Sequence, residues 1–259
     1  MSEITIRGNK VHYIEGEMFD KSRPTLLFIH GAGQRITTWR FQEDLFKNHP
    51  KFNYVALDLP GHGGSRGKGF RSVAEYKDFL LEFIGDLQLK DIILVGHSMG
   101  GGVAMLLAID HPEIVKACVL VATGASLKVA EQTLDTVKNN YTAFCEISPD
   151  RMFAEDSAKE LKQEFKEGLL DTGSEVSYWD LIACNEFDIM NKVEKISTPT
   201  LIISADKDIL TPVKYGEYLH LKIYGSEFHE IKGSGHFIMQ EKAHEFNGIL
   251  ENFLNDFIE

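Results

Sequence analysis

The chain of 259 residues is long enough for one large domain, or for one domain with an inserted subdomain, and for a sizeable buried core. Its formal net charge of -12 leaves no sustained basic stripe, which argues against nucleic acid and against an anionic membrane surface as partners. The three cysteines have no paired spacing, so we expect neither a disulfide framework nor a zinc site, and we interpret them as small buried residues.

The N-terminal segment predicts a β-hairpin. In residues 1–17, polar residues alternate with β-branched or aromatic residues around a turn at Gly8–Asn9. A secretory signal would instead begin with charge and continue with an apolar run. Because the chain also contains no run of roughly 18 apolar residues, the length that a membrane span needs, we expect a cytoplasmic protein without membrane insertion.

Short apolar segments with the composition of buried strands recur along the chain, at residues 25–31, 53–61, 91–98, 116–124 and 199–206. Helical patterns separate them. One helix has an apolar stripe at Tyr76, Phe79, Leu80 and Phe83, and the last helix has one at Phe246, Ile249, Leu250, Phe253 and Phe257. This alternation predicts an α/β fold, with a mostly parallel, doubly wound sheet and helices on both faces.

From Ser126 to about Lys195 the strand signal vanishes and the pattern becomes helical. The apolar residues of its first part step by three and four along one helical face, at Leu127, Ala130, Leu134, Val137, Tyr141 and Phe144. Ser148–Pro149 has the form of a helix start, and Ser157–Glu160 has the form of a capping box. We therefore expect a core domain of residues 1–125 and 196–259, with a helical cap of residues 126–195 inserted in it.

The segment Gly96–Gly100, with Ser98 at its centre, fits the pattern Gly-x-Ser-x-Gly between an apolar strand and helix-forming residues. A strand-to-helix turn this short is very tight, and glycines on both sides remove side chains that would collide with the backbone. The strained serine then holds its hydroxyl clear of the sheet. A glycine-rich helix start that only packs well or holds an anion is the plainer interpretation. The strand before and the helix after favour a nucleophile.

A serine hydroxyl attacks poorly unless a base takes its proton. His236 follows a late strand at 226–231 and a short turn, which places it at the carboxyl edge of the sheet, where the sites of such sheets collect. His30 and His62 also follow strands, and for them we favour local hydrogen bonds that organise loops. His97 is too close in sequence to Ser98 to turn its ring toward the hydroxyl.

Five motifs occur in a fixed order: HGAG at His30, DLPGHGGS at Asp58, GHSMGG at Gly96, SADKDILTP at Ser204 and GHFIMQE at Gly235. With them the sequence resembles the α/β-hydrolase superfamily, in its capped serine-hydrolase branch, over nearly the whole chain apart from the cap. The resemblance implies that Ser98 is the nucleophile, Asp208 the acid and His236 the base. It also implies an oxyanion hole made of the backbone N–H groups of Ala32 and Met99.

A second aspartate competes for the role of the acid. Asp206 and Asp208 both follow the strand at 200–204 closely enough to lie near His236. Asp208 stands four residues before Pro212, which matches the spacing of the superfamily, and we favour it. The acid's strand ends here in Ser204–Ala205, where members of the superfamily often have Trp-Gly.

The implied reaction is hydrolysis of a small-molecule carboxylic ester, with small to medium acyl chains, through an acyl-enzyme. It needs no organic cofactor, and no clustered ligand spacing indicates a metal. A serine at the elbow, instead of an aspartate, argues against the alkyl-enzyme chemistry of related epoxide hydrolases and haloalkane dehalogenases.

Several alternatives stay open within this resemblance. Thioesterases and acyltransferases share the motifs, and so do the carbon–carbon hydrolases of ring-cleavage products. Those hydrolases typically carry asparagine before the nucleophile and tryptophan after the histidine, where this chain has His97 and Phe237. A non-catalytic relative is the least favoured, because such relatives usually lose a triad residue and this chain has all three. The oligomeric state is left open.

Overall fold

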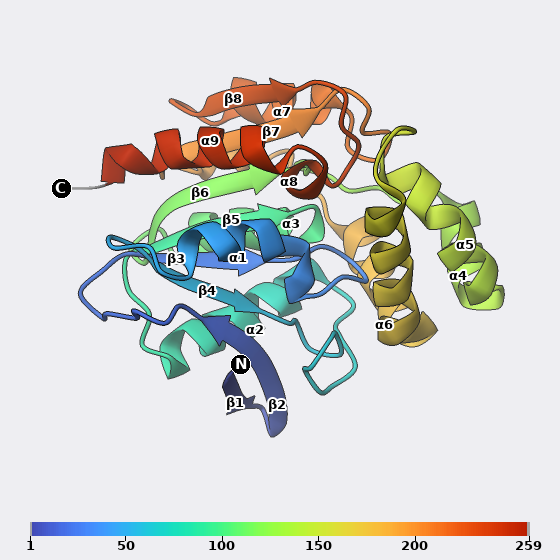
Figure 1. The fold of residues 1–259 in the computed structure, drawn as a ribbon, viewed down its shortest axis with the longest axis horizontal. Coiled ribbons are helices and arrows are strands. Elements are labelled where there is room, and N and C mark those ends of the chain that lie inside the picture. Colours follow the sequence, from blue (N-terminus) through green and yellow to red (C-terminus); the bar gives the residue numbers. More distant parts are fainter. Residues whose placement is uncertain (1, 258–259) are drawn as a thin grey trace.

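An eight-stranded sheet forms the centre of the protein (Figure 1), whose computed structural model describes residues 2–257. Its strand order is β1-β2-β4-β3-β5-β6-β7-β8. The strands are β1 Ser2–Ile6, β2 Asn9–Glu15, β3 Thr25–Ile29, β4 Asn53–Leu57, β5 Ile92–His97, β6 Val115–Val121, β7 Thr200–Ala205 and β8 Glu227–Ile231. All pairs from β4 to β8 are parallel, whereas β1 pairs with β2 and β2 with β4 in antiparallel fashion. The predicted mostly parallel sheet is confirmed.

The N-terminal hairpin turns one residue earlier than predicted. Arg7 and Gly8 form the turn, with φ of 49° and 78°, and Asn9 already belongs to β2, opposite Ile6. Of the two-residue hairpin turns that match the twist of their strands, the type I′ turn has positive φ at both central residues. Glycine adopts this conformation freely, which explains why Gly8 is the second residue of the turn.

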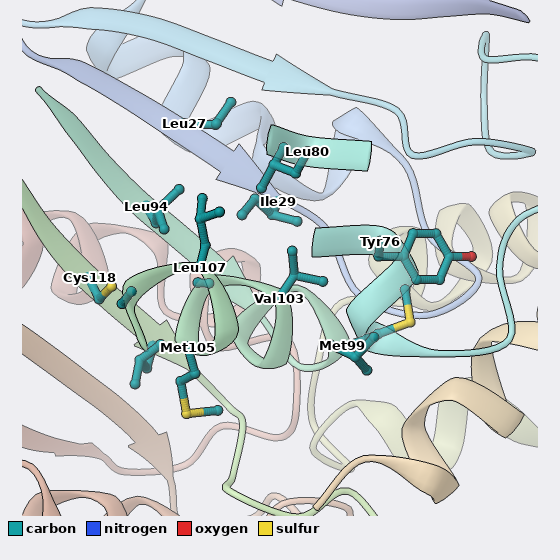
Figure 2. Close-up of a cluster of buried hydrophobic side chains, with 14 of the residues drawn as sticks. Leu27, Ile29, Tyr76, Leu80, Leu94, Met99, Val103, Met105, Leu107 and Cys118 are labelled. Carbon is teal, nitrogen blue, oxygen red and sulfur yellow. The ribbon is translucent and has the colours of Figure 1, made fainter. Parts of the chain in front are cut away.

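Helices cover both faces of the sheet, as predicted. Those beside the strands are α1 Arg40–Phe46, α2 Val73–Asp86, α3 Met99–Asp110, α7 Val213–Lys222, α8 Ile238–Glu241 and α9 Ala243–Leu254, with short 3-10 turns at η1 Ile36–Trp39, η2 Val193–Lys195 and η3 Asn255–Phe257. Side chains alternate along each strand, so Leu27 and Ile29 face α2 and α3, whereas Leu26 and Phe28 face α1 and α9. Figure 2 shows part of the first layer, with Leu27, Ile29, Leu94, Val103 and Leu107 in one cluster.

The segment between β6 and β7 is a helical insert at one end of the sheet, made of α4 Glu131–Asn139, α5 Tyr141–Met152 and α6 Lys159–Glu186 (Figure 1). The single helical face predicted from Leu127 to Phe144 is wrong in two places. Leu127 and Ala130 precede α4, and Asn140 has a non-helical backbone and caps α5 with its side chain. Helix α6 is interrupted at Gly173, which has φ of 81°.

One helix start predicted in this insert is wrong, and at a second, where α6 does begin at Lys159, the predicted cap is wrong. Ser148 and Pro149 lie inside α5, where the Ser148 hydroxyl donates to the Phe144 carbonyl one turn earlier, at 2.6 Å. Ser157 does not cap α6, whose N-cap residue is Ala158, and its hydroxyl donates to the Glu241 carboxylate of α8 at 2.5 Å. A cap would need each hydroxyl oxygen to accept a backbone N–H of the first helical turn, and the contacts found are donations to other oxygens.

The remaining structural expectations concern composition. Cys118, Cys145 and Cys184 are buried and free, so their interpretation as small buried residues is confirmed. Within residues 2–257, no helix combines the length and the apolarity that crossing a bilayer requires.

Candidate active site

Ser98 forms the sharp turn between β5 and α3. Its backbone has φ of 53° and ψ of -116°, a conformation that costs energy for any residue with a side chain. The flanking glycines make the turn possible, because a Cβ on Gly96 would lie 2.4 Å from the Gly100 carbonyl oxygen, and one on Gly100 would lie 2.4 Å from that of Ile29. The turn lifts Ser98 above the carboxyl edge of the sheet, where it is half-buried in the wall of a cavity.

Asp208 and His236 meet at the same edge. They follow β7 and β8, two adjacent parallel strands, and Asp208 Oδ2 lies 2.7 Å from His236 Nδ1. Asp208 also accepts hydrogen bonds from the Thr211 hydroxyl at 2.6 Å and from the backbone N–H groups of Leu210 and Thr211. Burial by itself would raise the pKa of the Asp208 carboxyl, but the His236 charge and these hydrogen bonds hold that pKa well below its ordinary value. Asp208 is therefore an ionised partner for the imidazole.

Asp206 has a different neighbourhood. Its carboxylate accepts the N–H of Gly233 at 2.6 Å, in the turn that precedes His236, and it lies 3.5 Å from the Lys207 ammonium group. It therefore shapes the turn that carries the histidine, while Asp208 contacts the imidazole ring.

Ser98 and His236 line one cavity of about 350 Å³. Among residues 2–257, no hydrogen bond joins the Ser98 hydroxyl to the His236 ring, so the structure brings the two together only as neighbours in one wall. Free enzymes often hold such a pair at longer range than the complex with substrate does. The insert lines much of the rest of the cavity with the apolar side chains of Phe144, Met152, Phe165, Leu169 and Leu181. It also contributes polar residues, namely Lys128, Thr133, Arg151 and Ser177.

The loop after β3 supplies a backbone donor to this cavity. The carbonyl of Gly31 accepts hydrogen bonds from His30 Nδ1 at 2.8 Å and from the Gln34 N–H at 3.2 Å. In a trans peptide the carbonyl and the following N–H point in opposite directions, so these bonds orient the N–H of Ala32, which lines the cavity. Within the described residues, neither this N–H nor that of Met99 donates to a protein acceptor. The Ala32 N–H therefore remains available to an oxygen in the cavity, whereas Met99 is fully buried and is not among the described residues that line it.

Two histidines near the site form hydrogen bonds with the backbone of the surrounding loops. His30 donates from Nδ1 to Gly31 and accepts the Leu59 N–H at Nε2, so its ring is neutral, and burial and the neighbouring His62 hold its pKa well below the ordinary value. His97 donates from Nε2 to the carbonyl of His236 at 3.0 Å, and burial again lowers its pKa. Both rings organise the loops around Ser98, in keeping with the roles that the sequence favoured for His30.

Glu241 was missed by sequence analysis. Its carboxylate accepts the N–H groups of Gly235 and Phe237, on either side of His236, and also the N–H of Ala154 in the insert. These donors come from separate segments, so no local sequence pattern indicates that they bond to Glu241. Glu241 thereby joins the loop that carries His236 to the helical insert.

A model of the alpha/beta hydrolase family matches residues 26–249. The chain belongs to this family. A solved structure of a thermophilic esterase is 34% identical, covers 98% of this hydrolase and 97% of its own chain, and superposes with a TM-score of 0.86. The enol-lactonase from Burkholderia xenovorans LB400 is 20% identical, with coverages of 98% and 100% and a TM-score of 0.91, which shows the fold. The putative esterase/lipase 2 of Mycoplasma pneumoniae is 29% identical over 230 residues and covers 83% of each chain.

Proposed function

We propose that this hydrolase cleaves carboxylic esters with small to medium acyl chains, through an acyl-enzyme on Ser98. The observation that carries the proposal is the 2.7 Å contact between Asp208 and His236 at a cavity whose wall contains Ser98 on its glycine-flanked turn. The thermophilic esterase supports the reaction class, because it shares 34% of its residues with this hydrolase over nearly the full length of both chains.

The proposed reaction follows from the hydrogen-bond roles of these groups. Because His236 Nδ1 donates to Asp208, its Nε2 is free to take the Ser98 proton as the serine oxygen attacks the ester carbonyl. The carbonyl oxygen gains the negative charge and accepts the N–H groups of Ala32 and Met99. The protonated His236 gives its proton to the leaving alcohol. Water then attacks the acyl carbonyl and loses a proton to His236, and His236 passes that proton to the Ser98 oxygen as the acid leaves.

We infer that residues 126–195 serve as the cap of a core formed by residues 1–125 and 196–259. The insert contributes most of the apolar wall, while the core contributes Ser98, His236 and the loop at Ala32. A cavity of about 350 Å³ holds an acyl chain of limited length. Thioesters and ring-cleavage products would use the same serine, so the assay includes them.

Labelling with a fluorophosphonate tests the nucleophile. Intact mass should show one adduct on the wild-type protein, on the peptide that contains Ser98, and none on Ser98→Ala. Ser174→Ala, which changes an exposed serine of the insert, is the matched control and should label fully. An unlabelled wild-type protein, or full labelling of Ser98→Ala, would refute the proposal.

Turnover assays test the substrate class. The wild-type protein is compared on p-nitrophenyl esters of graded length, on the matching acyl-coenzyme A thioesters and on a vinylogous diketone acid. We expect the largest kcat/KM on the shorter esters. A larger value on the diketone acid would transfer the assignment to carbon–carbon hydrolysis, and a larger value on the thioesters would transfer it to thioesterase activity.

A further inference from the structure

A buried carboxylate of the insert reaches into the core beside the active site. Asp180, on α6, is fully buried and accepts three hydrogen bonds, each from a different part of the core. Its Oδ1 accepts the Tyr76 hydroxyl of α2, and its Oδ2 accepts the Gly33 N–H at 2.7 Å and lies 2.8 Å from His62 Nε2. A carboxylate buried this deeply needs such partners, because an isolated buried charge is very unfavourable.

His62 carries the balancing charge. Its Nδ1 faces the Pro60 carbonyl at 3.2 Å and its Nε2 faces the Asp180 carboxylate, and both partners are acceptors only. Both ring nitrogens are therefore protonated. Burial by itself would lower the pKa of His62, but the Asp180 charge outweighs burial and raises it. Asp180 and His62 form a buried ion pair between the insert and the loop after β4.

Helix α6 forms hydrogen bonds with both backbone groups of Gly33, the N–H and the carbonyl. While Asp180 accepts the Gly33 N–H, the Thr172 hydroxyl of α6 donates to the Gly33 carbonyl at 3.2 Å. Gly33 has φ of 68°, and a Cβ there would lie 2.7 Å from the Leu169 side chain, so the glycine is enclosed by the insert. The Gly33 N–H belongs to the Ala32–Gly33 peptide group, and the Ala32 N–H belongs to the Gly31–Ala32 group before it. The two groups meet at the Ala32 Cα, so holding the first limits the orientations open to the second.

We propose that Asp180 and Thr172 are positioning residues for the oxyanion hole, holding the Gly33 peptide so that the Ala32 N–H points at the developing negative charge. This inference rests on the proposed function, in which Ala32 is one of the two donors. Neither side chain lines the cavity, so both act through Gly33. The insert then does more than enclose the substrate, since it sets the direction of a donor that belongs to the core.

A pair of ketone inhibitors distinguishes the loss of oxyanion stabilisation from a general folding defect. A trifluoromethyl ketone gains a Ser98–carbon bond and an oxyanion, while the serine proton passes to His236, and it therefore needs the oxyanion hole. A methyl ketone of the same chain occupies the cavity chiefly as the free ketone. In Asp180→Asn we expect kcat and trifluoromethyl ketone affinity to fall together, by about 10- to 100-fold, with KM and methyl ketone affinity nearly unchanged. Outright loss of one donor costs about 100- to 1,000-fold.

Asp171→Asn is the matched control. Asp171 precedes Thr172 on α6 and pairs with Arg35 of the core at 2.5 Å, but it does not contact Gly33. This variant should keep wild-type kcat and inhibitor affinities. If Asp180→Asn does not fold, Thr172→Val makes the same comparison. It removes one of two hydrogen bonds to the Gly33 carbonyl, the other coming from Gln34 Nε2 at 3.2 Å, so it should show a smaller loss with the same selectivity for the trifluoromethyl ketone.

Amide hydrogen exchange tests the inference without any turnover. Exchange in the peptide that contains residues 31–34 should quicken in Asp180→Asn or Thr172→Val and stay unchanged in Asp171→Asn. The inference would be overturned if exchange were unchanged in both Asp180→Asn and Thr172→Val, or if the affinities for the two ketones fell equally. The proposed function fails in a different way, namely if the wild-type protein forms no trifluoromethyl ketone adduct and hydrolyses no ester.

Discussion

The backbone N–H of His236 donates to the carbonyl of Met152 at 2.6 Å, so the last residue of α5 holds the residue that pairs with Asp208. The preceding residue, Gly235, allows this approach, because a Cβ on it would lie 2.7 Å from the same carbonyl oxygen. The insert and the histidine loop are therefore in backbone contact, and a single methyl group would separate them.

The first prediction concerns that contact. Gly235→Ala should displace either His236 or the end of α5 and lower kcat/KM by about tenfold or more, since small misplacements of a catalytic group have large effects. Gly248→Ala is the control, because a Cβ there meets nothing within 4 Å. It should keep full activity and raise stability by up to about 1 kcal/mol, as alanine does in a helix interior. Activity assays and thermal unfolding check both variants, and a fully active Gly235→Ala would contradict the prediction.

The second prediction separates the two aspartates. Asp208→Asn should lower kcat by about 1,000- to 10,000-fold, because an amide beside His236 Nδ1 favours the wrong tautomer of the ring. Asp206→Asn should cost much less, because Asp206 contacts the turn at Gly233 and not the ring. The two variants are measured on one activated ester, with circular dichroism confirming that each is folded. The reverse ranking would assign the acid to Asp206.

The third prediction concerns the depth of the cavity. On p-nitrophenyl esters, kcat/KM should rise with the first added methylenes, each contributing up to about 0.8 kcal/mol if fully buried, and then fall when the chain outgrows the cavity. Phe144→Ala removes a side chain from the cavity wall, which enlarges the cavity and should move the optimal acyl length to longer chains. Tyr224→Ala, at a side chain 99% exposed, should leave the profile unchanged. A wild-type profile that still climbs at long chains would indicate an open groove.

The fourth prediction is a pH dependence of stability from the buried ion pair. The pKa of His62 is raised by Asp180, with a further contribution from Asp58, while the facing His30 is neutral. A group whose pKa is higher in the folded state stabilises it fully below its unfolded pKa, about 6.5 for histidine, and this contribution is lost as the pH rises through the folded pKa.

The comparison of wild type with His62→Gln measures this effect. The difference between their free energies of unfolding should be largest at about pH 5.5 and should shrink as the pH rises above about 6.5. Urea unfolding at several pH values gives the difference directly. A difference that is constant with pH, or that grows with pH, would show that His62 is not charged in the folded protein.

Much of the fold follows from local sequence. Runs of apolar β-formers place β3 to β7 where they are found, and the apolar stripes of α2 and α9 face the sheet as predicted. The turn at Ser98 was likewise predictable from its local pattern of glycines. Only the collision at Gly96 is local, however, because a Cβ there meets the Gly100 carbonyl, whereas a Cβ on Gly100 meets the carbonyl of Ile29, on β3. The catalytic roles of Ser98, Asp208 and His236 stay predictions, although the contact between the last two residues was anticipated in sequence.

Other features were decided only by the tertiary structure. Ser157 resembles a helix cap in sequence, yet its hydroxyl donates to Glu241. No sequence pattern indicated a role for Asp180, although its carboxylate joins α2, the loop after β3 and the loop after β4. A polar side chain bonds to whichever partner packing brings nearest, and here those partners lie up to 147 positions away. Patterns of spacing report only neighbours within a turn or a strand, so they establish which elements form but not which polar groups meet when those elements pack.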